Sequence, residues 1–468
     1  MYGFHRKSAK AVAVILAAAL AVTSGCGTNT GKTAPATESQ QAETVAETSA
    51  TTAAAETTET TVEEETTMED AIPALKDCVE AKMGCRFGCA ITGDEPWDIG
   101  VWNIVTTHFN SVTFGNELKP DSLFGYSVTK CPGTQEAELN GETITVPVMD
   151  FSRPEKLLNK ILKWNETHPD QALQVRGHVL VWHSQTPEWF FHEDYDKEKP
   201  YVSKEEMDKR LEWYIREVLT HFVGEDSPYK DVFYGWDVVN EAISDATGTY
   251  RTETEKPEEA LSEDRHGSNS SWWHVYQSEE FIINAFKYAN KYAPETLELY
   301  YNDYNECQAG KRAGIIKLLE AVKAEEGAPG VGTRITAMGM QGHYGIAGPS
   351  YTEIELSAKE YGKVVGEVQI TELDMRASED YDGTKETQEA EYEKQRKQYN
   401  LYYYALQSAQ NSGDVKITGI TFWGTVDKYS WLQSRSNVGG GNTTKQGQCP
   451  LLFDNYYEPK PCFWVFAE

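Results

Sequence analysis

Short runs of apolar and β-branched residues alternate with longer amphipathic stretches from about residue 71 onward. The short runs predict β-strands, and the longer stretches, such as Met207 to Phe222 and Ser278 to Tyr292, predict α-helices. Eight strands that alternate with helices are typical of the (β/α)8 TIM barrel, an α/β fold. The expected strands cover residues 84–91, 111–116, 174–182, 232–240, 297–304, 335–341, 365–371 and 417–423.

Several of these strands end in polar residues that directly follow apolar ones. In a (β/α)8 barrel the catalytic groups lie at the carboxyl ends of the strands, so these residues are candidates for an active site. The polar residues at any one strand end could equally belong to a surface loop. Polar residues at several strand ends together favour an active site. The candidates are His178, Trp182, Asn240, Glu241, Gln341, His343, Glu372 and Asp374.

Two of the candidates are glutamates, Glu241 after the fourth expected strand and Glu372 after the seventh. Strands this far apart face one another across a barrel mouth, and glycosidases use two carboxyl groups that flank the bond. We therefore expect hydrolysis of a glycosidic bond without a metal or cofactor. A carboxyl separation of about 5–5.5 Å predicts retention of configuration and one of about 6.5–9.5 Å predicts inversion, and the sequence leaves this distance open.

The start of the chain predicts an export signal. Basic residues between positions 5 and 10 precede the apolar run Ala11 to Val22, which is too short to span a bilayer. The run ends in Thr23-Ser24-Gly25-Cys26, which resembles the cleavage site of bacterial lipoproteins, although Thr23 stands where leucine is usual. We expect residues 1–25 to be removed and Cys26 to carry a lipid. Ordinary signal-peptidase cleavage beside an incidental cysteine is the alternative.

Residues 26–70 consist largely of Thr, Ala and Glu and contain no aromatic residue. Such a segment cannot form a core and predicts a disordered spacer. The organisation that follows is a signal peptide, a lipid-anchored spacer and a catalytic domain over residues 71–468. This predicts an extracellular protein on the surface of a bacterium, which contacts the membrane only through its lipid anchor.

Charge and composition narrow the class of partner. The chain has 43 Lys and Arg against 73 Asp and Glu, a net charge of -30, so nucleic acids and anionic lipid surfaces are repelled. Aromatic residues make up 12%, including 12 Trp and 26 Tyr. Such an abundance is common in proteins whose aromatic side chains stack on the flat faces of sugar rings, although a large core also uses Trp and Tyr.

The chain contains 8 cysteines, which leaves an odd number once Cys26 is set aside. Their irregular spacing, without a repeated CxxC, argues against a structural zinc site. Cys449 and Cys462 flank the final segment and are a candidate disulfide pair. An anaerobic habitat, where exported thiols survive, explains the cysteines equally well.

The polar strand ends also carry a resemblance to a known family. From about residue 75 to 468 the chain resembles the glycoside hydrolase family 10 endo-β-1,4-xylanases, with the family's motifs in the family's order. The motifs are Asn116-Glu117-Leu118-Lys119, Gly177 to Phe190, Trp236 to Ala242, Asn302 to Asn305 and Ile370 to Met375, supported by Met340 to Tyr344 and Trp423 to Trp431.

The resemblance implies a retaining enzyme that hydrolyses internal bonds of xylan by double displacement. It implies that Glu241 is the general acid/base and Glu372 the nucleophile. Asn240 would bond the 2-hydroxyl of the cleaved sugar, and Asp374 would orient the nearby histidine. Xylan and xylo-oligosaccharides are the expected partners, and we expect a monomer. The further substrate-binding positions that it implies are Asn116, Lys119, His178, Trp182, Gln341, His343, Trp423 and Trp431.

Two features depart from the family pattern. Gly115 stands where the family usually has the first glutamate of the distal sugar-binding cluster. Residues 127–148 form an insertion with Cys131, Gly141 and an alternating run at 143–146, which predicts a small β-hairpin. We expect this hairpin to lie over the non-reducing end of the cleft and to rebuild distal sugar binding.

Three other functions fit parts of the pattern. A barrel glycosidase acting on β-glucan also places Asn-Glu after strand four, but the TPEWF and NDYN runs argue against it. A surface lipoprotein that binds polysaccharide without cutting it does not need both glutamates. A structural envelope protein does not explain the polar strand ends. The tolerated xylan decorations and the product lengths are open at this level.

Overall fold

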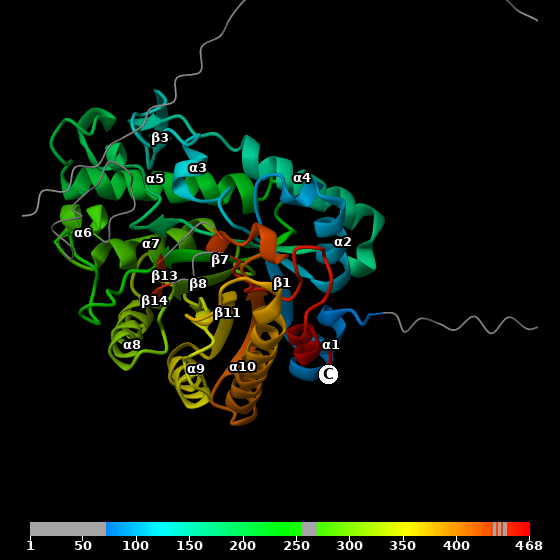
Figure 1. The fold of residues 1–468 in the computed structure, drawn as a ribbon. Helices are drawn as coiled ribbons and strands as arrows, with labels where there is room; N and C mark the ends of the chain where they lie inside the picture. Colours follow the sequence, from blue (N-terminus) through cyan, green and yellow to red (C-terminus); the bar gives the residue numbers. More distant parts are fainter. Residues whose placement is uncertain (1–71, 255–268, 434–436, 439–440, 443–446) are drawn as a thin grey trace, which may run out of the picture. The chain divides into compact units, whose positions relative to one another are not determined.

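A computed structural model describes residues 72–254, 269–433, 437–438, 441–442 and 447–468. The expected signal peptide, Cys26 and the spacer lie outside the described residues. The centre of the fold is a ring of parallel strands (Figure 1). In ring order these strands are β12 (Lys416–Phe422), β1 (Arg86–Ile91), β2 (Ser111–Phe114), β5 (Gln174–Gly177), β7 (Phe233–Asn240), β8 (Glu298–Asp303), β9 (Ala337–Met340) and β11 (Glu367–Arg376).

The ring is closed because β11 pairs with both β9 and β12. This confirms the predicted (β/α)8 TIM barrel with 8 parallel strands. Closure leaves no free strand edge and brings the carboxyl ends of all the strands to one face. The short strands are β6 (Val181–Trp182), β10 (His343–Gly345), β13 (Asn437–Val438) and β14 (Gly441–Asn442).

Helices surround the barrel (Figure 1), and the two clearest predicted helices are confirmed as α5 (Lys204–Val223) and α7 (Glu280–Tyr292). The other helices are α1 (Leu75–Met83), α2 (Ile99–His108), α3 (Pro120–Leu123), α4 (Ser152–Thr167), α6 (Ser271–Tyr276), α8 (Ala309–Ala324), α9 (Tyr351–Val365), α10 (Lys385–Asn411) and α11 (Trp464–Ala467). The 3-10 turns are η1 (Glu95–Trp97), η2 (Pro169–Gln171), η3 (Glu188–Phe191), η4 (Glu193–Tyr195), η6 (Asp427–Tyr429), η7 (Trp431–Gln433) and η8 (Pro461–Phe463).

The barrel strands are buried along almost their whole length, as β7 illustrates with every residue buried. A strand covered on both faces needs apolar residues at successive positions, which explains the continuous apolar runs in the sequence. The barrel interior also holds an ion pair between Arg176 of β5 and Asp237 of β7. Both side chains are at most 1% exposed, so each charge depends on the other for compensation.

The predicted hairpin exists, but its predicted position is wrong. Strands β3 (Thr134–Leu139) and β4 (Glu142–Pro147) pair antiparallel around Asn140-Gly141. Both turn residues have positive φ, 51° and 86°, as a tight hairpin turn requires. The hydrogen bonds that leave the hairpin go mainly to α5 and α7 on the outside of the barrel, for example from Asn140 Nδ2 to Glu212 Oε2 at 2.9 Å. Figure 1 likewise shows β3 beside α5.

The cysteines of the described part are free thiols, so the candidate pair Cys449 and Cys462 does not form. Each of the two thiols is buried, and burial raises the pKa of each to about 12, which keeps them protonated. Within the described ranges no cluster of His, Cys, Asp and Glu is arranged to hold a metal ion. Among the described helices, none combines the length and the apolar character needed to cross a membrane.

Candidate active site

The predicted site residues lie together at the carboxyl face of the barrel. Glu241 directly follows β7, and Glu372 lies on β11 just beyond its pairing with β9. Glu372 is buried and Glu241 is partly exposed. The face is therefore a place where one carboxylate is shielded from water while the other remains accessible.

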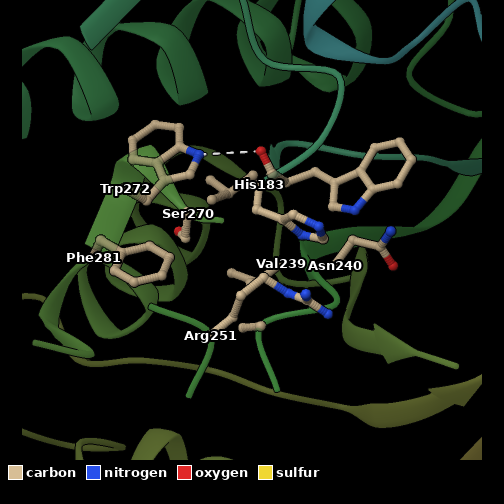
Figure 2. Close-up of a pocket in the computed structure, with 10 residues that line it drawn as sticks. His183, Val239, Asn240, Arg251, Ser270, Trp272 and Phe281 are labelled. Atoms are coloured by element: carbon tan, nitrogen blue, oxygen red, sulfur yellow. Dashed lines mark hydrogen bonds between the residues drawn. The ribbon is translucent and has the colours of Figure 1, made fainter. Parts of the chain in front are cut away.

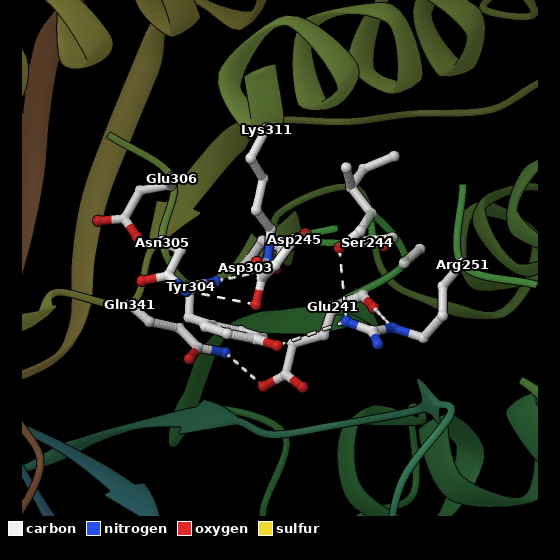
Figure 3. Close-up of polar contacts among 12 residues, drawn as sticks. Glu241, Ser244, Asp245, Arg251, Asp303, Tyr304, Asn305, Glu306, Lys311 and Gln341 are labelled. Atoms are coloured by element: carbon white, nitrogen blue, oxygen red, sulfur yellow. Dashed lines mark hydrogen bonds and ion pairs between the residues drawn. The ribbon is translucent and has the colours of Figure 1, made fainter. Parts of the chain in front are cut away.

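A chain of side-chain amides joins the two glutamates. Gln341 Nε2 donates to Glu241 Oε1 at 2.9 Å (Figure 3) and lies 3.2 Å from Asn240 Oδ1. Asn302 Nδ2 donates both to Asn240 Oδ1 at 2.9 Å and to Glu372 Oε1 at 2.8 Å. The two carboxylates thus belong to one hydrogen-bonded site, contributed by β7, β8, β9 and β11.

Asn302 is a site residue that the sequence did not single out. Its Oδ1 accepts a hydrogen bond of 2.6 Å from Thr371 Oγ1, which fixes the orientation of the amide. Gly339 on β9 makes room for it, because a Cβ added there would lie 2.3 Å from Asn302 Oδ1. Its position at the end of the fifth strand, within the Asn302 to Asn305 motif, was the available signal.

His343 connects the buried glutamate to a second carboxylate. His343 Nε2 lies 3.2 Å from Glu372 Oε2, and His343 Nδ1 lies 3.0 Å from Asp374 Oδ2. Trp431 Nε1 donates to Asp374 Oδ2 at 2.7 Å, and the ring of Trp431 packs against the imidazole. Asp374, which is predicted to orient the histidine, thus lies in direct contact with His343.

These contacts determine the ionisation of both groups. Burial alone would lower the pKa of His343, but Asp374 and Glu372 outweigh it and raise that pKa to about 10. Burial alone would raise the pKa of Glu372, but the hydrogen bond from His343 and nearby positive charges lower it to about 2. At neutral pH the site therefore holds an imidazolium beside an ionised Glu372.

Glu241 occupies a different setting. Its Oε2 accepts a hydrogen bond of 2.9 Å from Trp182 Nε1. Its backbone has φ 56°, a left-handed conformation that is uncommon for a residue with a side chain. Its backbone carbonyl accepts from Arg251 Nε at 3.1 Å. The surrounding structure thus holds Glu241 in a conformation that the chain alone disfavours.

A hydrogen bond from Trp272 fixes the backbone of Trp182. Trp272 Nε1 donates to the backbone oxygen of Trp182 at 3.2 Å. The dashed line from Trp272 in Figure 2 marks this hydrogen bond. A small pocket lies beside this contact, with Asn240 and Arg251 on its wall. The indole that bonds Glu241 is therefore part of the packed barrel top.

A buried lysine occupies another part of the site. Lys119 Nζ donates to Gln185 Oε1 at 3.1 Å and lies 3.4 Å from Asn116 Oδ1. It also lies 5.0 Å from the centre of the Trp182 ring and 5.9 Å from that of Trp423. Burial lowers the pKa of Lys119, while Glu372 and other carboxylates oppose this effect. Gln185 was not among the predicted binding residues.

His178 lies between the barrel interior and the site. Its Nδ1 is 2.8 Å from Asp237 Oδ2, so it joins the buried ion pair with Arg176. Its ring makes an edge contact with Trp423, with centroids 5.6 Å apart. Asp237 is a supporting residue that the sequence did not predict, although it lies in the motif that contains Glu241.

Glu117 has a structural contact that explains its place in the second-strand motif. Its Oε1 accepts hydrogen bonds from Thr92 Oγ1 at 3.0 Å and from the backbone N–H of Gly93 at 2.6 Å. The carboxylate therefore stabilises the loop after β1.

The chain is similar to one known family and to several known proteins. Residues 74–468 match the model of "Glycosyl hydrolase family 10". "Endo-1,4-beta-xylanase A" of Thermotoga neapolitana is 32% identical over 400 residues, which covers 85% of this chain and 31% of that protein. "Endo-1,4-beta-xylanase B" of Paenibacillus barcinonensis is 31% identical over 363 residues, with 77% and 88% covered. The chain thus spans about a third of the first of these relatives and most of the second.

Solved structures show the same fold. A Clostridium thermocellum N-terminal endo-1,4-β-D-xylanase 10B, complexed with xylohexaose, superposes with a TM-score of 0.65 at 27% identity, covering 85% of this chain and 68% of that one. The family 10 structure from Paenibacillus barcinonensis gives a TM-score of 0.65 at 26% identity, with 85% and 97% covered.

Proposed function

Because this chain belongs to glycosyl hydrolase family 10, we propose that it is a retaining endo-β-1,4-xylanase that hydrolyses internal bonds of xylan. The observation that carries the proposal is the amide chain that joins Glu241 to Glu372 through Gln341, Asn240 and Asn302. It places two carboxylates in one site but in unlike surroundings, as acid catalysis and nucleophilic attack require. The related xylanases support xylan as the substrate.

In the first half of the reaction Glu372 attacks the anomeric carbon. As this bond forms, the bond from that carbon to the glycosidic oxygen breaks, and Glu241 gives its proton to the departing oxygen. The low pKa of Glu372, about 2, keeps the nucleophile ionised. Its second oxygen is held by His343, so attack is directed through a carboxylate whose orientation is restricted.

In the second half a water molecule replaces the released sugar chain. Glu241, now ionised, removes a proton from the water, whose oxygen attacks the anomeric carbon while the bond to Glu372 breaks. Two inversions give net retention. The same carboxyl group must serve as acid and then as base, and its exposure to the open face suits this exchange.

We assign substrate contacts by the same resemblance. Asn240 bonds the 2-hydroxyl of the cleaved sugar, a contact that strengthens as the ring becomes oxocarbenium-like. Lys119 and the indoles of Trp182, Trp423 and Trp431 line the surface against which the sugars bind. These indoles surround charged groups of the site, and such rings offer flat faces to sugars.

The two glutamates are distinguished by their alanine variants. Glu372→Ala should abolish turnover on every substrate, since no glycosyl-enzyme can form. Glu241→Ala should still form glycosyl-enzyme from aryl xylobiosides with activated leaving groups, then stall until azide releases the β-glycosyl azide. Product analysis by NMR gives the anomer. An α-azide, or α-configured sugar as the first product of the wild type, contradicts retention; activity on carboxymethylcellulose rather than xylan contradicts the substrate.

We further propose that the protein is a monomeric surface lipoprotein, exported by residues 1–25 and anchored through Cys26. The support is the basic and apolar signal pattern and the cysteine that follows it. The acidic spacer 27–70 gives the catalytic domain reach toward an insoluble polymer.

A further inference from the structure

A buried ionic cluster lies behind Glu241 and takes no part in the mechanism above. Lys311 on α8 has a side chain that is 0% exposed, and its Nζ lies 2.9 Å from Asp303 Oδ1 and 2.5 Å from Asp245 Oδ1 (Figure 3). Asp303 is also fully buried. We call Lys311, Asp303 and Asp245 the Lys311 cluster.

The cluster is tied to the backbone at Glu241 by a closed circuit of contacts. Asp303 Oδ2 accepts a hydrogen bond of 2.5 Å from Tyr301 OH, and Tyr301 OH accepts one of 3.0 Å from the backbone N–H of Ala242. Ala242 is the residue after Glu241, and Asp245 lies three residues further along the same turn. Lys311 therefore holds this turn at two points, through Asp245 directly and through Asp303 and Tyr301.

Packing of α8 against the same turn is an independent observation. A Cβ added to Gly248 would lie 2.7 Å from the backbone oxygen of Gly310, and one added to Gly314 would lie 2.2 Å from that of Gly248. These glycines let the helix and the turn approach backbone to backbone. Lys311 is thereby brought within reach of Asp245.

Glu241 needs such support because its own conformation is strained. Its positive φ of 56° is disfavoured for a residue that carries a side chain. The backbone N–H of Glu241 donates to the carbonyl oxygen of Asn302 at 2.9 Å, and Arg251 holds its carbonyl. The Lys311 cluster fixes the residues that follow, so that the turn cannot relax.

The cluster also limits the negative charge near the acid/base. Burial raises the pKa of Asp303 to about 6, Lys311 opposes this, and the charge of Glu241 adds to it. The ionisation of Asp303 therefore depends on the charge of Glu241. A stability role alone would not require an ion pair here, since well-packed apolar residues often replace buried pairs without loss of stability.

We propose that Lys311, through Asp303, Asp245 and Tyr301, is a positioning residue for the acid/base Glu241. This inference rests on the proposed function and deepens it. It assigns to a residue that touches neither substrate nor reacting atoms the task of holding the Glu241 carboxyl where it can donate and accept the proton.

The test uses two aryl β-xylobiosides with the same sugar and different leaving groups. Phenol needs a proton to depart, whereas 2,4-dinitrophenolate does not. In Lys311→Met, kcat/KM on the phenyl substrate should fall about 10- to 100-fold, because part of the usual contribution of a general acid is lost. On the dinitrophenyl substrate kcat/KM should fall less than about twofold, because this leaving group needs no proton. Azide should raise kcat on the dinitrophenyl substrate, since the base step is also slowed.

Two further variants complete the design. Tyr301→Phe removes the hydroxyl that joins Asp303 to Ala242 and should show the same dependence of kcat/KM on the leaving group. It therefore tests the positioning role even if Lys311→Met does not fold. Lys460→Met is the matched control: Lys460 is equally buried and pairs with Asp427 at 2.9 Å. Any loss in this control should be equal on both substrates.

The outcomes separate the two proposals. Equal losses on both substrates, or no loss on either, in a folded Lys311→Met or Tyr301→Phe overturn the positioning role and leave the proposed function intact. A wild-type enzyme that cleaves neither xylobioside overturns the proposed function and, with it, this inference.

Discussion

At the scale of single residues, His343 keeps the carboxyl group of Glu372 ionised. It pairs with both Glu372 and Asp374, and its own pKa is raised to about 10. The imidazolium therefore persists across the neutral range and holds the pKa of Glu372 at about 2. A cation beside a carboxylate favours its charged form, so removing the cation must raise the carboxyl pKa.

His343→Gln should move the acid limb of kcat/KM to higher pH by about 1–3 units, the usual effect of an opposite charge. Glu372 reacts only when ionised, so activity is lost as pH falls through its pKa. A dinitrophenyl xylobioside is the suitable substrate, because Glu241 need not protonate its leaving group. His192→Gln, which alters a buried histidine bonded to Glu188 outside the site, should leave the limb in place. An unmoved limb in His343→Gln contradicts the electrostatic role.

Gly115 is a second position where one side chain matters. A Cβ added there meets Thr92 Cβ at 3.4 Å as its nearest neighbour, so the backbone accepts a Cβ at this position. Gly115→Glu should lower KM on xylotriose and xylotetraose more than on polymeric xylan, because short substrates depend on each contact. Gly115→Gln tests whether charge is needed. Unchanged KM on the short substrates contradicts a distal sugar contact at this position.

At the scale of elements, the hairpin β3–β4 belongs to the outer surface. Its tip bonds Glu212 on α5 and Lys291 on α7, and its side chains Leu139 and Val146 are buried. This arrangement removes the basis for a role of the hairpin in distal sugar binding. Its contribution is to cover apolar surface of the helical layer.

Deletion of residues 134–147 tests this interpretation. The backbone N–H of Val148 donates to Gly133 O at 2.9 Å, so a two-residue Asn-Gly turn can join the ends. We expect unchanged KM on xylotetraose and on xylan, and a melting temperature lower by a few degrees, since each buried Leu or Val contributes about 1.5–3 kcal/mol. A raised KM on xylotetraose with an unchanged melting temperature would show that the hairpin reaches the substrate.

At the scale of the whole molecule, the family match covers residues 74–468 and so contains the complete barrel. A chain of residues 71–468 should fold with the same melting temperature and kcat/KM as the mature protein, and sediment as a monomer. Failure to fold contradicts the assignment of 26–70 as a dispensable spacer.

The anchor has its own test. The wild type expressed in a bacterium should partition into the detergent phase, and Cys26→Ala should move to the aqueous phase with full activity. A lipid chain on the amino-terminal cysteine is the physical reason for this difference. Identical partition of the two proteins contradicts the lipoprotein assignment.

The sequence by itself determined the barrel and the position of Glu241 and Glu372 at the ends of its strands. Runs such as Phe233 to Trp236 have apolar residues or glycine at successive positions because both faces of the strand are buried, and this pattern is readable without coordinates. Glu241 and Glu372 were visible because charged residues at the ends of such strands are conspicuous. Even the hairpin was readable from its alternation around Gly141.

The tertiary structure alone decided which side chains meet. The bridge that Asn302 makes between Asn240 and Glu372 depends on the register of β7, β8, β9 and β11 after closure of the ring. The contact of Lys311 with Asp245 spans 66 residues, and no local periodicity reports it. The hairpin was misplaced for the same reason. Local sequence records how buried each position is and with what period, whereas the identity of the neighbour is set by segments distant in the chain.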